Sequence, residues 1–193
     1  MCGIAGYIGK GNVGIKLVGY LEKLEYRGYD SAGVAIVLPR GEISVVKRAG
    51  EVKKLKIAVP GDEAQTGIAH TRWATHGRAD EINAHPHLSP DGSWAVVHNG
   101  IIENFDDLKR KYFADEEFFS RTDSEIIPRL LGRFAREKTM AGFMKCVRLL
   151  AGSFAIAAVA EGRNEIYLAK EKSPLYVAKK GTFLTVASDP ICF

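Results

Sequence analysis

The chain has 193 residues, of which 46% are hydrophobic and 26% are charged. This length is enough for one substantial core and short for two independent domains, so we treat residues 1–193 as one domain. Lysine and arginine number 27 against 23 aspartate and glutamate, which gives a net charge of +4. The basic residues are scattered and form no concentrated stripe, so nucleic acid is not expected as a partner.

Cysteine usage and the apolar runs indicate the compartment. Cys2, Cys146 and Cys192 have no paired spacing, as a disulfide framework would require. The sequence shows no signal peptide and no apolar run long enough to span a membrane. We therefore expect a cytoplasmic protein with no membrane partner. Cys146 lies inside an apolar helical pattern and is predicted to be a core residue.

The N-terminal half contains more predicted strands than helices. Asn12 is predicted to cap a helix with an apolar face that consists of Ile15, Val18, Leu21 and Leu24. Residues 27–31 form a loop after that helix. Short apolar runs predict strands at 4–8, 34–38, 43–46 and 67–71, the middle two joined as a hairpin.

The rest of the chain has helices in the middle and strands at the end. A Pro90-Asp91-Gly92 turn predicts a hairpin between residues 87–88 and 94–97. Asn104 is predicted to cap a short helix at 105–112. Residues 122–125 have capping-box spacing before a helical region to about residue 150, interrupted near 138–139. The last apolar runs, at 154–160, 166–169, 176–179 and 183–187, predict an antiparallel meander. This order predicts an α+β fold of antiparallel sheets covered by helices.

Cys2 is the first candidate for chemistry. Once Met1 is removed, its α-amine titrates near neutral pH and can act as the base for its own thiol. A lone cysteine at this position is more often a packing residue, so the interpretation depends on what accompanies it.

An amide-splitting thiol needs an oxyanion hole. Asn99 offers a side-chain amide and Gly100 an unhindered backbone N–H. Local sequence alone favours a simple Asn-Gly hairpin turn at this point.

Such a site also needs groups that bind the charged ends of a zwitterionic substrate. Arg72 can bind a carboxylate through two parallel hydrogen bonds, with Thr75 and His76 as further donors and Trp73 beside them. Alternatively, Arg72 is a surface ion-pair residue and Trp73 is core. Asp123 can bind an ammonium group, or can merely favour the start of a helix.

The five histidines all fall between His70 and His98, which raises the hypothesis of a metal site around His85 and His87. No Cys, Asp or Glu stands at ligand spacing around them, so we expect no metal.

Six segments in order resemble the glutaminase domain of the glutamine–fructose-6-phosphate aminotransferase family, which belongs to the class II glutamine amidotransferases. They are Met1-Cys2-Gly3-Ile4, residues 27–33, residues 70–77, Asn83-Ala84-His85-Pro86-His87, residues 98–104, and Thr122-Asp123-Ser124-Glu125. Nearly the whole chain is covered. The resemblance implies the four-layer αββα sandwich of N-terminal-nucleophile hydrolases and no metal or organic cofactor.

The resemblance also implies roles for single residues. Cys2 would be the nucleophile, its α-amine the base, and Asn99 with the Gly100 N–H the oxyanion hole. The glutamine carboxylate would bind Arg72, Thr75 and His76, and its ammonium group would bind Asp123 and Gly100. Trp73 would belong to a loop that closes over the substrate, and Arg27 would lie near the N-terminal residue.

The family carries a sugar-phosphate isomerase module after this domain, and that module is absent here. The resemblance implies such a module as a partner, in the same polypeptide or as a separate subunit, and a homodimer formed through it. Two alternatives stay open. The chain could supply ammonia in another class II amidotransferase, such as the phosphoribosylpyrophosphate enzyme or asparagine synthetase, or it could bind glutamine without hydrolysing it.

Overall fold

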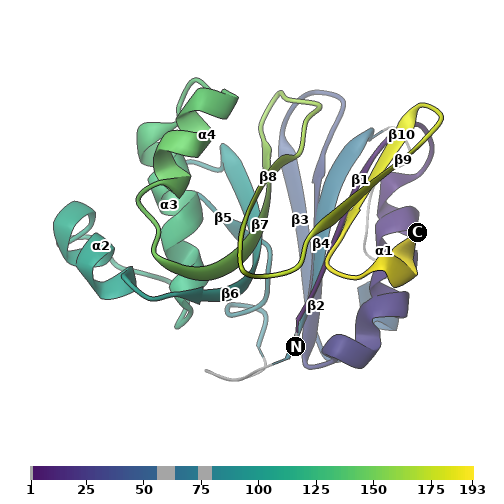
Figure 1. Cartoon of the computed structure of the whole chain (residues 1–193), viewed down its shortest axis with the longest axis horizontal. Helices are drawn as coiled ribbons and strands as arrows, with labels where there is room; N and C mark the ends of the chain where they lie inside the picture. Colours follow the sequence, from purple (N-terminus) through teal and green to yellow (C-terminus); the bar gives the residue numbers. More distant parts are fainter. Residues whose placement is uncertain (1, 56–63, 74–79) are drawn as a thin grey trace.

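The computed structural model describes residues 2–55, 64–73 and 80–193. Within these residues, two antiparallel sheets lie face to face (Figure 1). The larger sheet, in the order β3-β2-β4-β1-β10-β9, consists of β1 (Gly3–Ile8), β2 (Ser31–Val37), β3 (Ile43–Ala49), β4 (Thr66–Arg72), β9 (Tyr176–Lys180) and β10 (Phe183–Ala187). The smaller sheet, in the order β5-β6-β7-β8, consists of β5 (His87–Leu88), β6 (Trp94–Ile102), β7 (Gly152–Ala160) and β8 (Tyr167–Glu171).

Helices cover the outer faces of both sheets (Figure 1). Helix α1 (Val13–Leu24) packs on β1 and β4 of the larger sheet. On the other side lie α2 (Phe105–Tyr112), α3 (Ile126–Phe134) and α4 (Met140–Val147), of which α3 contacts β6 and α4 contacts β8. The resulting α, β, β, α layers confirm the predicted α+β sandwich.

Strand β7 shows why the two sheets pack together. Ala155, Ala157 and Val159 point into the cluster between the sheets, whereas Phe154 and Ile156 belong to the cluster under α3 and α4. Successive side chains in a strand point to opposite faces, so a strand buried on both sides needs an unbroken apolar run. The small residues on the inner face allow the sheets to approach closely.

Helix α1 is where predicted, and of its predicted apolar face Val18, Leu21 and Leu24 are buried, but Ile15 is not. Asn12 accepts a hydrogen bond from the Ile15 N–H at 2.9 Å, which confirms the predicted cap. Ile15 itself is 69% exposed, while Val13 and Leu17 are fully buried. Two residues along a helix correspond to about 200° of rotation, so Ile15 points away from both neighbours and from the sheet.

Two other predicted caps were wrong. Asn104 does not cap α2; its amide binds the Leu149 carbonyl and the Ala151 N–H, at 2.8 and 2.9 Å. Thr122 makes no capping bond either, and the helical region starts as a 3₁₀ turn at Asp123–Glu125. The Glu125 carboxylate accepts N–H groups of the preceding loop, among them that of Ser120 at 2.6 Å. The Thr122 hydroxyl lies 3.1 Å from His87 Nε2, so in both cases a tertiary partner takes the place of the local capping bond.

The C-terminal strands do not form a single meander as predicted. Strands β7 and β8 pair in the smaller sheet, whereas β9 and β10 pair in the larger one, with β10 beside β1. The chain therefore crosses from one layer to the other after β8. The interruption between α3 and α4 is confirmed, since Lys138 has a φ of 53° there.

Cys146 lies in the core as predicted. Its thiol donates to the Leu130 carbonyl at 3.4 Å, and burial raises its pKa to about 11. None of the helices in the described part of the chain has the length and apolar character of a membrane span.

Candidate active site

A cavity of about 480 Å³ opens beside Cys2. The predicted site residues that line it are Cys2, Arg72, Trp73, Gly100 and Asp123. Strand pairing explains part of this convergence, because Gly3 of β1 pairs with Thr71 of β4 and so places the end of β4 beside the start of β1. Strand β6 of the smaller sheet brings Gly100, and the 3₁₀ turn before α3 brings Asp123.

Backbone and side-chain donors hold Cys2 in place. Its carbonyl oxygen accepts hydrogen bonds from Arg27 Nε and from Asn99 Nδ2, each at 3.1 Å. Its sulfur accepts the Trp73 N–H at 3.4 Å. Arg27 thus lies at the N-terminal residue, where the resemblance implied it, and Asn99 reaches Cys2 from the opposite sheet.

The side chain of His70 orients the Asn99 amide. His70 Nε2 lies 2.9 Å from Asn99 Oδ1 and 3.1 Å from the His98 carbonyl oxygen. Two acceptors face this one nitrogen, so it carries the ring proton and donates. The Asn99 oxygen is held on the histidine side, and the amide N–H groups are directed to Cys2.

The Asn99-Gly100 pair is not the hairpin turn that local sequence favours. Strand β6 continues through it to Ile102, and Gly100 pairs with Phe154 of β7. Gly100 has a φ of 127°, and a β-carbon there would overlap the Ser153 carbonyl oxygen. Only glycine fits this position. Gly100 lines the cavity, whereas Asn99 is not among the lining residues and contacts the Cys2 carbonyl through its amide.

The loop after α1 supports the end of β4. A β-carbon on Gly28 would lie 2.6 Å from the Arg72 carbonyl carbon, so the loop can pack this closely only with glycine. The Asp30 N–H donates to the Arg72 carbonyl at 3.1 Å, and the Tyr29 ring contacts the Trp73 ring edge-on at 5.4 Å. These contacts place the Trp73 N–H against the Cys2 sulfur. Sequence reasoning assigned no role to Tyr29, although its place in the 27–33 segment was a signal.

The two charged substrate candidates both reach the cavity. Arg72 is only 6% exposed, which contradicts the alternative of a surface ion-pair residue, and Trp73 is 41% exposed, which contradicts a core position. One oxygen of Asp123 accepts the Ile102 N–H at 2.6 Å, which anchors the carboxylate to the end of β6. Thr75 and His76 lie outside the described residues.

The cavity is also lined by residues that sequence reasoning did not identify. They are Phe105 and Lys109 of α2, and Phe118 and Arg121 of the loop before α3. The Lys109 ammonium lies 4.5 Å from the centre of the Phe118 ring. No motif in the sequence pointed to these residues, because only the fold brings α2 next to the 122–125 segment.

Four buried histidines form a cluster at the cavity, and two of them, His85 and His98, line it. The ring centres of His70 and His85 are 4.2 Å apart, and those of His85 and His87 are 4.6 Å apart. Burial lowers the pKa of His70 to about 3 and that of His98 to about 4, and it lowers the pKa of His85 and His87 well below the usual value. All four rings are therefore neutral near pH 7. Among the described residues, no three His, Cys, Asp or Glu side chains are placed to hold a metal ion.

Because these buried histidines are neutral, we expect the free energy of unfolding to fall as the pH is lowered. Each of the four folded-state pKa values lies below 6.5, the ordinary value for histidine. Below that pH the unfolded chain binds protons that the folded chain does not, so stability falls with falling pH until the buried rings protonate. The slope is about 1.4 kcal/mol per pH unit for each histidine. Urea unfolding between about pH 6 and pH 5 measures it.

Replacing His85 by phenylalanine tests the assignment. His85 is suitable because neither of its ring nitrogens has a hydrogen-bond partner among the described residues. We expect the pH slope to fall by about 1.4 kcal/mol per pH unit, whatever the change in absolute stability. An unaltered slope would show that other groups cause the acid sensitivity.

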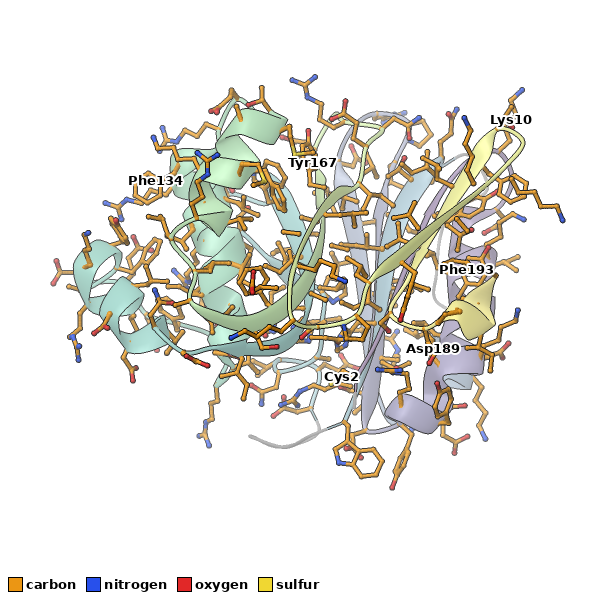
Figure 2. All side chains as sticks on the ribbon, viewed as in Figure 1. Cys2, Lys10, Phe134, Tyr167, Asp189 and Phe193 are labelled. Carbon is orange, nitrogen blue, oxygen red and sulfur yellow. The ribbon has the colours of Figure 1, made fainter. Side chains whose placement is uncertain are left out.

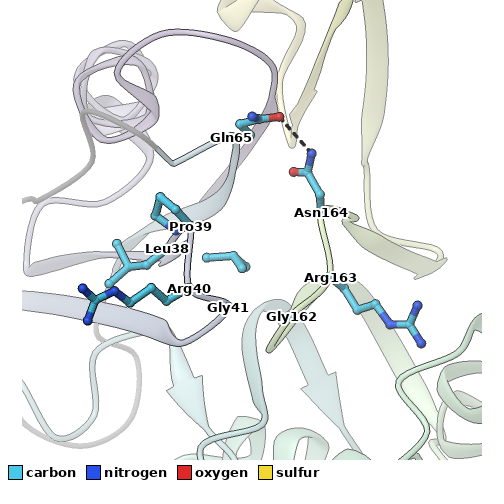
Figure 3. A pocket seen from close by; sticks show the side chains of 9 residues that line it. Leu38, Pro39, Arg40, Gly41, Gln65, Gly162, Arg163 and Asn164 are labelled. Atoms are coloured by element: carbon cyan, nitrogen blue, oxygen red, sulfur yellow. Dashed lines mark hydrogen bonds between the residues drawn. The ribbon is translucent and has the colours of Figure 1, made fainter.

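A second cavity, of about 440 Å³, is lined in part by the turn between β2 and β3 (Figure 3). Strand register places this turn at the opposite end of the larger sheet from Cys2, since Val37 pairs with Thr66 at the start of β4 and Gly3 pairs with Thr71 near its end. Its lining includes Arg40, Gln65, Arg163 and Asn164, and the Asn164 amide donates to Gln65 at 3.2 Å. The described residues that line it include no thiol, imidazole or carboxylate, so it has no group for acid–base or nucleophilic chemistry.

The layers, together with a cysteine at the start of a central strand, define the fold class of N-terminal-nucleophile hydrolases. Glutamine phosphoribosylpyrophosphate amidotransferase from B. subtilis has this fold, with a TM-score of 0.84 and 22% identity over 100% of this chain and 43% of that chain. A glutamine aminotransferase class-II domain protein from Silicibacter pomeroyi is also similar, with a TM-score of 0.62 and 17% identity over 98% of this chain and 89% of that one. At these identities the likeness establishes the fold alone.

Sequence comparison identifies the family. Residues 70–193 match the family model of the glutamine amidotransferase domain, and the chain belongs to this family. It is 50% identical to the glutamine–fructose-6-phosphate aminotransferase (isomerizing) of Geobacillus kaustophilus and 49% identical to that of Listeria monocytogenes, over 98% of this chain in both cases. The chain spans 32% of the length of each of these relatives. The predicted resemblance is confirmed.

Proposed function

We propose that this domain, residues 1–193, hydrolyses glutamine to glutamate and ammonia, with Cys2 as the nucleophile. The main support for the proposal is the cavity beside the Cys2 thiol, where the Arg72 guanidinium and the Asp123 carboxylate both reach the lining. A free amino acid presents the complementary pair of charges, an α-carboxylate and an α-ammonium group. The same cavity therefore offers a nucleophile and a means of orienting a small zwitterion.

The first half of the reaction forms a thioester. With Met1 removed, the α-amine of Cys2 takes the thiol proton, and the thiolate attacks the side-chain carbonyl carbon of glutamine. The carbon–nitrogen bond then breaks, and the amine passes its proton to the leaving nitrogen, which departs as ammonia. In the second half, water attacks the thioester with the amine as base, and glutamate leaves with the thiol restored.

Asn99 and Gly100 stabilise the oxyanion that forms in both halves. The Asn99 amide nitrogen has two N–H groups, so one can keep its bond to the Cys2 carbonyl while the other donates to the substrate oxygen. The Gly100 N–H is the second donor. The His70 contact fixes the amide before the substrate arrives, and such preorganised donors act without reorganisation in the transition state.

Replacing Arg72 by lysine tests whether Arg72 binds the glutamine carboxylate. Lysine keeps the charge but cannot reproduce two parallel hydrogen bonds to a carboxylate. Loss of one charge-assisted hydrogen bond costs about 1.5 kcal/mol, so we expect the KM for glutamine to rise about tenfold. Glutamate release at varied glutamine concentration measures it.

Arg40→Lys at the second cavity is the matched control and should leave KM unchanged (Figure 3). A KM in Arg72→Lys equal to that of the parent chain would remove Arg72 from the site. Absence of glutamate release from the parent chain would instead support a module that binds glutamine without hydrolysing it.

The ammonia serves, in this proposal, for glucosamine 6-phosphate synthesis from fructose 6-phosphate in the complete enzyme. The support is the identity of about 50% to relatives named glutamine–fructose-6-phosphate aminotransferase, against 22% for the phosphoribosylpyrophosphate enzyme. The remaining two thirds of those relatives fit a sugar-phosphate isomerase module, in the same polypeptide or as a partner subunit, through which a homodimer forms. We place the protein in the cytoplasm, which suits its three free cysteines.

A further inference from the structure

Asp189 lies just after β10 and connects the C-terminal segment to the residues around Cys2. One of its oxygens accepts hydrogen bonds from Arg27 Nη1 at 3.0 Å and from the Tyr26 hydroxyl at 2.6 Å. Its other oxygen accepts the Ile191 N–H at 3.0 Å and so caps the short turn Pro190–Cys192. Figure 2 shows Asp189 and Cys2 at the same end of the sheets.

Arg27 joins Asp189 to the nucleophilic residue. Its Nη1 binds the Asp189 carboxylate, and its Nε donates to the Cys2 carbonyl at 3.1 Å. These two nitrogens belong to one rigid planar group, so fixing one end fixes the direction of the other. The Arg27 side chain is only 9% exposed, and a cation at that depth needs a counter-charge.

The backbone next to Asp189 is tied to the same strand. The Ser188 N–H donates to the Ile4 carbonyl, and the Ser188 hydroxyl accepts the Ile4 N–H, each at 2.9 Å. These bonds hold the backbone next to Asp189 against β1. The Asp189 carboxylate is therefore held in one place, where it binds Arg27. The Tyr26 hydroxyl and the Ile191 N–H hold the pKa of Asp189 below its usual value, so it carries its negative charge near pH 7.

We propose that Asp189 is a positioning residue for catalysis: it fixes Arg27, which fixes the Cys2 carbonyl and thereby the amine and thiol of the nucleophile. The effect on glutamine turnover rests on the function proposed above. Asp189 does not line the cavity, so it acts on the rate of the chemical step and not on substrate affinity.

The first test is Asp189→Asn, which keeps the shape and removes the charge. We expect kcat for glutamine to fall about tenfold and KM to stay within about twofold. Asp189→Glu, which restores the charge, should recover part of the lost kcat. The matched control is Glu161→Gln, which removes an ion pair with Lys138 of 2.7 Å at the other end of the sheets and should leave kcat unchanged. An Asp189→Asn variant with the parent kcat, or with a raised KM and normal kcat, would overturn the proposal.

A double-mutant comparison separates positioning from general destabilisation. If Asp189 acts through Arg27, Asp189→Asn should lower kcat in the parent chain and cause no further loss in an Arg27→Ala background. Equal losses in both backgrounds would contradict the proposal.

Tyr26→Phe provides a milder variant at a 62% exposed side chain, where folding is not at risk. It removes one bond to Asp189 and should lower kcat about twofold to threefold, and an unchanged kcat would count against the proposal.

Alkylation of Cys2 by iodoacetamide tests the role of Asp189 without depending on glutamine hydrolysis. The other two thiols are buried, and burial raises the pKa of each to about 11, so Cys2 is the reactive one. Asp189→Asn should slow the alkylation of Cys2 several-fold, and an unchanged rate would contradict the proposal. If the parent chain hydrolysed no glutamine, the proposed function would fail, while the alkylation rates would still test the role of Asp189.

Discussion

Replacing Cys2 by alanine is expected to abolish glutamine hydrolysis and leave the fold intact. No other described thiol lines the cavity, and loss of a covalent nucleophile lowers kcat by at least about 10³-fold. Within the described part of the chain, the hydrogen bonds of the thiol are two weak ones, at 3.4 and 3.9 Å, both with the Trp73 backbone. We therefore expect the free energy of unfolding to change by less than about 1 kcal/mol. Glutamate release and urea unfolding measure the two effects.

Cys192→Ala is the matched control for this variant. Cys192 is buried, and burial raises the pKa of its thiol to about 11, so it stays protonated and unreactive near pH 7. Its removal should leave kcat at the parent value. Turnover by Cys2→Ala at the rate of Cys192→Ala would exclude Cys2 as the nucleophile.

Replacing Asn99 by alanine is expected to lower kcat about 10²-fold to 10³-fold, with a much smaller change in KM. The amide nitrogen donates to the oxyanion only as charge develops, so its loss raises the energy of the transition state and not that of bound glutamine. Steady-state kinetics of glutamate release separate the two constants. The second cavity offers Asn164→Ala as a control amide, whose loss should change neither constant.

Asn99→Asp makes the test sharper. The aspartate keeps an acceptor for the His70 N–H, which lies 2.9 Å from the Asn99 oxygen, but it places an anion where the amide N–H groups were. An anion beside a developing oxyanion is repelled, so kcat should fall at least as far as in the alanine variant. If Asn99→Asp kept the parent kcat, Asn99 would have no part in the oxyanion hole.

The strands could be predicted from the sequence because burial leaves a local pattern. The hairpin between β2 and β3 and the start of β6 follow from turn residues between apolar runs. The sheet to which each strand belongs has no such signal, and β8 and β9 are separated by too few residues to indicate a change of layer. The buried face of α1 was misjudged at Ile15 for a similar reason, since an isolated apolar residue can point to solvent.

In the candidate site, too, some residues could be predicted from the local sequence, and others depend on contacts that only the fold creates. Cys2, Arg72 and Asp123 could be selected by chemistry, and the structure brings them to one cavity. The path of the chain through Asn99 and Gly100 could not be predicted locally, because Asn-Gly is typical of a turn and only pairing with β7 extends the strand. Asp189 escaped notice because it is more than 160 positions from Arg27 in sequence, yet hydrogen-bonded to it.

The most direct test of a self-activated N-terminal cysteine compares two preparations of this chain, one starting at Cys2 and one that keeps Met1. Intact mass establishes each terminus, and glutamate release measures turnover. Only the first preparation has a free amine on the residue that carries the thiol, so only it should hydrolyse glutamine. Equal turnover by the chain that keeps Met1 would contradict the account.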